Sequence, residues 1–257
     1  MKIVAVIPAH LASVRFPEKV LFPFHGLPMI EHVRRRALLS SAISEVYVAT
    51  CDQQIYDVVH GYGGNVIMTS KTHKNGTTRV ADAVKDIDCT HVLLLQGDEP
   101  LLLPRHLDSF AKAISAEPEG DAWNATGPIN SEEELDRHSF VKCAVGNAHR
   151  ILYCFRRSPC YSDFHSQQLF IRKILGIIAY RKDFLLQLVA LPESQIEQFE
   201  FIEQMRIINY GYTIKSIPVE PSLPSVNEPA ESSLVLSYIL NDQEQGDLLK
   251  SILRDFN

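Results

Sequence analysis

The first half of the chain alternates short apolar runs with longer segments of helical periodicity. The apolar runs cover residues 3–7, 45–50, 66–68 and 92–95. Consecutive apolar positions of this kind are typical of strands that are buried on both faces of a parallel sheet. The segments between them with helical spacing are 28–39, which opens on a proline, 54–60 and 80–87. This strand–helix–strand order predicts an α/β fold whose parallel strands are joined by right-handed crossovers.

The second half of the chain predicts more strands and fewer regular crossovers. Strands are expected at 121–129, 140–145, 151–155, 171–180 and 213–219, and helices at 104–116, 194–209, 229–240 and 247–256. The aromatic stretch 157–170 has no core periodicity, which predicts a mobile lid or an oligomer contact. No repeat or linker divides the chain, so we expect one domain over residues 1–257.

The most buried of the predicted strands ends in two carboxylates. The run Val92 to Leu95 is followed by Gln96-Gly97-Asp98-Glu99-Pro100. Open α/β sheets bind their ligands in the crevice beyond the carboxyl ends of their strands, so Asp98 is the first candidate for a metal ligand. An ordinary strand-ending turn has the same composition.

A polar loop follows the first predicted strand and carries His10, Ser13, Arg15 and Lys19. Loops at this position commonly hold an anion through backbone N–H groups and Arg or Lys side chains. The glycine fingerprints of dinucleotide sites and P-loops are both missing from this sequence. A solvated surface turn is the alternative.

A second polar turn, residues 72–79, opens the predicted helix at 80–87. Asn75 or Thr77 is suited to cap that helix. The free N–H groups of the helix and Arg79 would then face whatever the neighbouring loops hold. A cap without a ligand is the alternative.

Composition narrows the possible functions. The formal net charge of −6 and the scattered basic residues argue against a nucleic-acid partner. The 5 cysteines form no CxxC pair, which favours reduced thiols in a cytoplasmic protein and argues against a disulfide framework or a zinc site. No apolar run reaches the length of about 18 residues that a membrane span needs.

Taken together, PAHLASVRFPEK, HKNGTTR and VLLLQGDEP resemble the bacterial 3-deoxy-manno-octulosonate (Kdo) cytidylyltransferases, within the wider group of sugar nucleotidyltransferases. The similarity continues, in chain order, through Val141-Lys142, Leu152-Tyr153 with Arg156, Leu175-Gly176-Ile177, Ile196-Glu197, Glu203 to Arg206 and Tyr210-Gly211. It implies a three-layer Rossmann-like α/β nucleotidyltransferase with a mainly parallel mixed sheet. The implied protein is a homodimer with a nucleotide-binding part at about 1–130 and a sugar-binding and dimerisation part at about 131–257.

The resemblance implies transfer of CMP from CTP to a sugar acid, with release of pyrophosphate. Two polyanions meet in such a reaction, so catalysis is mainly charge neutralisation and in-line positioning. Mg²⁺ prefers one or two carboxylates together with phosphate oxygens. The implied roles are catalysis by Lys19, Asp98 and Arg15; nucleotide binding by Ala9, His10, Ser13, Asn75, Gly76, Thr77, Arg79 and Gln96; substrate binding by Arg156, Glu203 and Gln204; and Mg²⁺ binding by Asp98 and Asn227.

The chain departs from the family at positions that bear on the nucleotide. His10 stands where the family has an arginine, and Glu18 where it has a glycine. Loss of a permanent cation and gain of an anion should weaken binding of a triphosphate. Asn227 stands where the family has a second carboxylate, although the adjacent Glu228 could substitute for it.

On the sugar side, Ile174 and Ile178 replace a histidine and a tyrosine of the family, and Phe155 replaces a serine. Buried hydroxyls without partners cost about 1–3 kcal/mol each, so we expect an altered acceptor, less hydroxylated or differently substituted. Two further hypotheses remain open. One is a homologue that binds nucleotide without turning it over, and the other is a glycosyltransferase of similar architecture, which would release no pyrophosphate.

Overall fold

A computed structural model of the chain describes residues 1–254, which group into two compact units. The first unit combines Met1–Ala111 with the described residues from Leu223 onward, and the second is Lys112–Ser222. The C-terminal segment therefore packs with the N-terminal strands, whereas the division expected near residue 130 grouped it with the second part.

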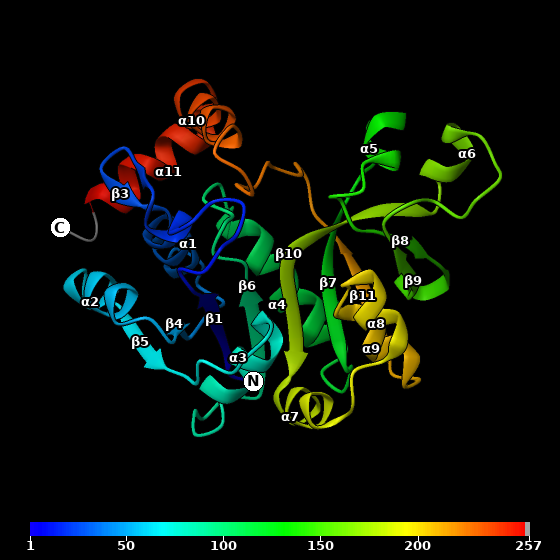
Figure 1. The fold of residues 1–257 in the computed structure, drawn as a ribbon, viewed down its shortest axis with the longest axis horizontal. Helices are drawn as coiled ribbons and strands as arrows, with labels where there is room; N and C mark the ends of the chain where they lie inside the picture. Colours follow the sequence, from blue (N-terminus) through cyan, green and yellow to red (C-terminus); the bar gives the residue numbers. More distant parts are fainter. Residues whose placement is uncertain (255–257) are drawn as a thin grey trace. The chain divides into compact units, whose positions relative to one another are not determined.

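The sheet of the first unit is entirely parallel, in the order β6-β1-β4-β5 (Figure 1). These strands are β6 (His91–Leu95), β1 (Ile3–Ala9), β4 (Glu45–Thr50) and β5 (Asn65–Met68). All of them coincide with the predicted apolar runs. Every residue of β6 is buried, as consecutive apolar positions predict for a central parallel strand.

The crossover helices of this unit are α1 (Met29–Leu38), α2 (Gln53–Gly61) and α3 (Gly76–Ala83). The chain passes from β1 through α1 and α2 towards β5, and then returns through α3 to β6. Because right-handed crossovers in opposite directions place their helices on opposite faces, α1 and α2 cover one face and α3 the other. This arrangement gives the first unit the predicted three layers.

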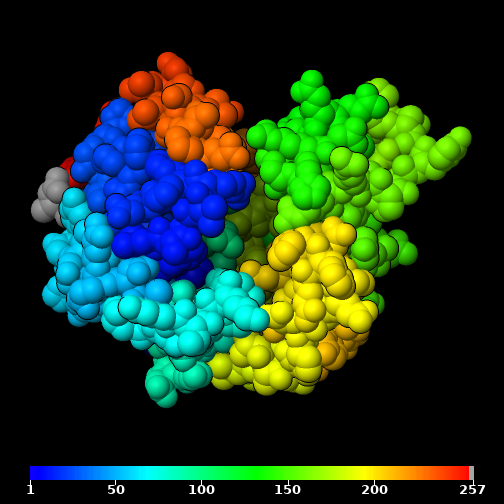
Figure 2. All heavy atoms as spheres, viewed as in Figure 1, coloured from blue at the N-terminus to red at the C-terminus, as the bar shows by residue number. Residues whose placement is uncertain are grey.

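The C-terminal helices α10 (Glu231–Asn241) and α11 (Gln243–Arg254) complete the first unit. Arg36 Nη1 of α1 donates to Gln245 Oε1 at 2.7 Å, and Arg35 Nη1 donates to the carbonyl of Ile252 at 2.8 Å. Figure 2 shows the orange C-terminal residues packed against the blue N-terminal ones. The end predicted for the last helix, Phe256, lies outside the described residues. The short elements before α1 are a 3-10 turn (Lys19–Leu21), β2 (Pro23–Phe24) and β3 (Leu27–Pro28).

The strands of the second unit are mixed in direction. β7 (Ala122–Gly127) pairs in parallel with β11 (Ile214–Pro218) and antiparallel with β10 (Ile171–Arg181). β8 (Lys142–Val145) and β9 (Ile151–Phe155) extend the sheet from β10 in antiparallel pairs. The expected α/β class with a mainly parallel, mixed sheet is therefore confirmed.

Several short helices of this half were not expected. They are α5 (Glu132–Asp136), a 3-10 turn (Asn147–His149), α6 (Phe164–Gln168) and α7 (Lys182–Ala190), while α4 (Pro104–Ala116) matches its prediction. α6 lies within the stretch 157–170, whose sequence shows no core periodicity, and the Asp163 side chain caps the helix by accepting from the N–H of Ser166 at 3.0 Å. One helical turn is too short to show a period.

The single helix predicted at 194–209 is wrong, because the segment forms α8 (Gln195–Glu200) and α9 (Gln204–Asn209). Phe201 ends α8 in the left-handed conformation, with φ 54°. Arg156 donates to the carbonyl oxygens of Glu200 at 2.8 Å and Phe201 at 3.2 Å. These carbonyls thus find a partner outside the helix, and the apolar spacing by three could not reveal the break.

Glu31 provides a test of how the first unit is stabilised. It is fully buried in α1 and accepts from Arg34 Nη2 at 2.6 Å and Arg35 Nε at 3.1 Å. Breaking a buried ion pair from one side leaves buried charge uncompensated, so Glu31→Ala should lower the free energy of unfolding by about 3–5 kcal/mol in urea titrations. The exposed pair Asp247–Lys250 is the matched control, and Asp247→Ala should leave the free energy of unfolding nearly unchanged. Equal losses of unfolding free energy in both variants would contradict a stabilising role for the buried ion pairs of Glu31.

Candidate functional site

A pocket of about 640 Å³ opens in the first unit at the carboxyl ends of β1, β4, β5 and β6. Residues that follow all these strands contribute to it, as expected for a parallel sheet. The predicted site residues that line the pocket are Ala9, His10, Ser13, Arg15, Lys19, Asn75, Gly76, Arg79, Gln96 and Asp98. Thr77 does not line it and is buried within α3.

The floor of this pocket is organised by the contact between Lys19 and Asp98. Lys19 Nζ lies 2.5 Å from Asp98 Oδ2 and donates to the carbonyl of Val226 at 3.2 Å. The N–H of Val226 in turn donates to the carbonyl of Asp98 at 2.9 Å. Three distant segments, the loop after β1, the end of β6 and the segment before α10, therefore meet at one point.

The loop after β1 is held by its backbone. The N–H of Leu11 donates to Asp52 Oδ2 at 2.9 Å, and the N–H groups of Ser13 and Glu18 both donate to the carbonyl of Leu11, at 2.8 and 3.1 Å. Glu18 adopts a left-handed conformation with φ 56°. A glycine adopts this conformation without strain, which accounts physically for the glycine that the family resemblance expects here.

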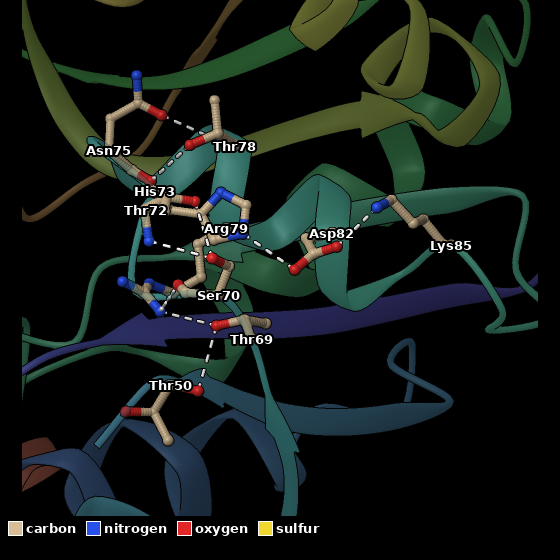
Figure 3. Close-up of polar contacts among 10 residues, drawn as sticks. All are labelled: Thr50, Thr69, Ser70, Thr72, His73, Asn75, Thr78, Arg79, Asp82 and Lys85. Atoms are coloured by element: carbon tan, nitrogen blue, oxygen red, sulfur yellow. Dashed lines mark hydrogen bonds and ion pairs between the residues drawn. The ribbon is translucent and has the colours of Figure 1, made fainter.

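The loop between β5 and α3 is fixed by Arg79 (Figure 3). Arg79 is only 4% exposed, and its Nη1 donates to Thr69 Oγ1 at 2.7 Å and to the carbonyl of Ser70 at 3.4 Å. Thr69 Oγ1 donates to the carbonyl of Thr50 at 3.2 Å, which ties the loop to β4. The guanidinium is thus engaged in positioning this loop at the edge of the pocket.

The N-terminus of α3 confirms one capping prediction. Asn75 Oδ1 accepts from the N–H of Thr78 at 2.9 Å, so Asn75 and not Thr77 is the cap. The helix consequently begins at Gly76, earlier than predicted. A Cβ atom at Gly76 would lie 3.1 Å from Pro8 Cγ, so glycine permits the helix to approach the end of β1 closely.

His10 contributes no permanent charge to the pocket. Burial lowers the pKa of its imidazole, and the nearby Arg79 and Lys19 lower it further against the opposing effect of Asp52 and Asp98. The neutral form of the ring is therefore favoured more than in an ordinary histidine, whose pKa is 6.5.

The predicted substrate-side residues all belong to the second unit. Arg156 lines a pocket of about 420 Å³, together with His138, Arg157 and the aromatic rings of Tyr153 and Phe155. The Arg156 guanidinium donates to backbone carbonyls, including that of His138 at 3.1 Å. Two arginines, two aromatic rings and the carboxylate of Glu200 therefore line this pocket.

Glu203 and Gln204 open α9. Gln204 Nε2 donates to Oδ1 of the fully buried Asn124 at 2.9 Å. Asn124 Nδ2 then donates to the carbonyls of Leu175 at 3.0 Å and Ile177 at 3.4 Å, within the irregularity where β10 and β7 shift register. Gln204 thus supports β10 through Asn124.

Part of the first pocket is formed by residues that were not among the predicted site residues. Cys51 and Asp52 follow β4, and Lys71, His73 and Lys74 lie between β5 and α3; all of them line it. The signal was present in the sequence, because these residues follow strands already predicted to be parallel neighbours of β1.

One carboxylate of the pocket is suited to hold a metal ion. Asp98 Oδ1 has no hydrogen bond within residues 1–254, while Oδ2 contacts Lys19. Asn227 follows Val226, and its Nδ2 donates to Ser225 Oγ at 3.0 Å. The described residues contain no cluster of three or more His, Cys, Asp or Glu side chains with metal-site geometry. A metal ion at this position would be bound by one carboxylate and by oxygen atoms of a bound substrate.

Over the described range, the helices are too short or too polar to cross a membrane.

The fold and the pocket define an α/β protein with a polar pocket, lined by Arg and Lys side chains, at the carboxyl edge of a parallel sheet. The sequence profile of the cytidylyltransferase family matches residues 4–217. The chain belongs to the cytidylyltransferase family.

Curated relatives support this assignment over nearly the whole chain. The 3-deoxy-manno-octulosonate cytidylyltransferase of Escherichia coli is 36% identical over 89% of this chain and 92% of its own length. The 8-amino-3,8-dideoxy-manno-octulosonate cytidylyltransferase of Shewanella sediminis is 36% identical over 94% of this chain and 100% of its own. The family resemblance inferred from the sequence motifs is thereby confirmed.

Solved structures agree with the fold. The structure of CMP:2-keto-3-deoxy-manno-octonic acid synthetase complexed with CTP matches with a TM-score of 0.88 and 34% identity, over 94% of this chain and 100% of that one. The inositol-1-phosphate CTP transferase from T. maritima matches with a TM-score of 0.68 and 16% identity over 100% and 98%, which shows the shared fold alone.

The neutral His10 predicts a pH-dependent affinity for CTP. Protonation of the imidazole adds a cation to the pocket, so the contribution of His10 to CTP binding should grow as the pH falls towards its lowered pKa. Isothermal titration from about pH 7.5 to about pH 5.5 should show the affinity ratio of wild type to His10→Gln rising several-fold. Because both proteins bind the same CTP at each pH, the ratio of their affinities is independent of the protonation of CTP itself. A ratio that stays constant with pH would contradict the prediction.

Proposed function

We propose that this protein transfers CMP from CTP to Kdo or a related sugar acid and releases pyrophosphate. The observation that carries the proposal is the pocket in which Lys19, Arg15 and Asp98 converge at the strand ends. Relatives of the same length that are named for this activity support the nucleotide and the acceptor class.

Different residues of the pocket would bind the phosphates and the rest of the nucleotide. Ser13 and the backbone around Ala9 would hold phosphate oxygens, with Arg15 and Lys19 neutralising their charge. Gln96 and the α3 N-terminus at Gly76 would lie along the nucleotide, in a loop that Arg79 holds in place.

Magnesium is the metal that this site fits. Mg²⁺ is usually held by one or two carboxylates and by substrate phosphates, and Asp98 Oδ1, which has no hydrogen bond to the residues that the structure describes, offers such a ligand. Asn227 would contribute at most a neutral amide oxygen. The bound metal would add to the charge neutralisation that Lys19, beside Asp98, would supply at the phosphates.

The acceptor side supports an altered substrate. Ile178 is 5% exposed, and Gln204 is engaged with Asn124, so neither offers the polar contact that the family resemblance assigns to its position. Arg156 and Glu203 would remain to bind the acid. An acceptor with fewer or differently placed hydroxyl groups, such as an amino-substituted Kdo, fits this change.

A homodimer in the cytoplasm is also part of the proposal. The second unit exposes large apolar side chains, among them Phe199 and Phe201 at 80% and Leu169 at 86%. Such residues commonly mark an interface, and a second copy of the chain would cover them. The expected location follows from the reduced state of the cysteines.

Pyrophosphate release tests this function directly. The protein is incubated with CTP and Mg²⁺ against Kdo, 8-amino-Kdo and sialic-type acids, and we expect release with at least one octulosonate. Asp98→Ala should lose turnover by about a thousandfold, as for other groups that stabilise charge in a transition state, while its thermal unfolding stays cooperative. CTP binding without release on any acceptor would instead favour the nucleotide-binding homologue.

Asn227 provides a separate test of the metal site. Asn227→Asp adds a carboxylate beside the segment that contacts Asp98, so it should lower the Mg²⁺ concentration for half-maximal turnover by about tenfold. Ser222→Asp, outside that contact, is the control and should leave the Mg²⁺ dependence unchanged. If neither substitution alters this dependence, Glu228 or another group takes the role.

A further inference from the structure

Two lysines of the segment Thr69–Asn75 have no role in the proposal above. Lys71 and Lys74 both line the pocket that contains Asp98. Both side chains are exposed, and neither has a hydrogen bond or an ion pair within residues 1–254. They are thus available to a ligand.

The other permanent cations of this pocket are already engaged within the protein. Lys19 contacts Asp98 and the carbonyl of Val226. Arg79 is buried and donates to the loop that it supports. Arg15 faces Glu228 at 3.9 Å. Lys71 and Lys74 are therefore the permanent cations of this pocket that have no hydrogen bond or ion pair within residues 1–254.

The segment that carries these lysines is anchored on both sides of each one. Thr69 and Ser70 are held by Arg79, His73 Nε2 lies 2.9 Å from Asp82 Oδ2, and Asn75 caps α3 (Figure 3). An anchored backbone gives the flexible lysine stems a fixed origin at the edge of the pocket. Their ammonium groups can then reach a bound anion without a change in the loop.

The loop after β1, which also lines the pocket, carries less positive charge than the family resemblance expects. His10 replaces an arginine and Glu18 adds an anion, whereas a nucleoside triphosphate still carries several negative charges. Ammonium groups are donors only and are attracted to phosphate oxygens rather than to a neutral base or ribose.

We propose that Lys71 and Lys74 bind the phosphates of the nucleotide and replace the positive charge that position 10 lacks. The inference rests on the proposed function, which makes this pocket the nucleotide site. It assigns part of the phosphate recognition to the loop between β5 and α3, rather than wholly to the loop after β1.

Titration calorimetry without an acceptor tests this inference. Lys71→Gln and Lys74→Gln should each weaken CTP binding about fivefold at low salt, and the double variant about twenty-fold, with a smaller dependence on salt. Cytidine binding should not change. Lys112→Gln, an exposed lysine outside the pocket, is the matched control. Thermal unfolding should be unchanged in all variants, because neither Lys71 nor Lys74 has a partner among residues 1–254.

Rescue distinguishes charge replacement from a general surface effect. Adding His10→Arg to the double variant should restore much of the CTP affinity. Unchanged CTP affinity in the double variant, or an equal loss of cytidine binding, would overturn the inference. Inorganic tripolyphosphate is titrated in parallel, so that phosphate binding by the two lysines is tested even if CTP is not the ligand. A lack of turnover without a change in phosphate binding would contradict the proposed function and not this inference.

Discussion

The contact between Lys19 and Asp98 is the constraint on which the first unit's site depends. Asp98 follows a strand whose residues are all buried, and Lys19 follows the loop after the neighbouring strand. The backbone of Val226 bonds to both residues, which brings the C-terminal segment to the same place. A carboxylate and an ammonium group are thus held together at the edge of the sheet. There the ammonium can interact with an anion and the carboxylate with a metal ion.

The charge around this contact has moved relative to the family pattern. The loop after β1 has His10 where the family resemblance expects an arginine and Glu18 where it expects a glycine, and the backbone of Glu18 takes a conformation that glycine adopts more easily. The loop after β5 supplies Lys71 and Lys74 instead. A pocket recognises a polyanion through the summed field of its charges, so their source can change while the ligand class does not.

The second unit shows how packing changes the role of a residue. Gln204 belongs to a motif that the resemblance places on the substrate side, yet in this fold its amide bonds to the buried Asn124. Asn124 satisfies the carbonyls of an irregular part of β10. A buried amide without such partners would be destabilising, so this network fixes the shape of β10 next to Ile178.

The sequence by itself determined the parallel strands, their helices, the family and most of the first pocket. Buried strands need consecutive apolar residues, and strand ends place ligand-binding loops at one edge, so both leave a local pattern. Tertiary structure decided the break at Phe201, the return of the C-terminal helices to the N-terminal strands, and the tasks of Arg79 and Gln204. Those features depend on hydrogen bonds between residues far apart in the chain, such as Arg156 with Glu200, which no local spacing records.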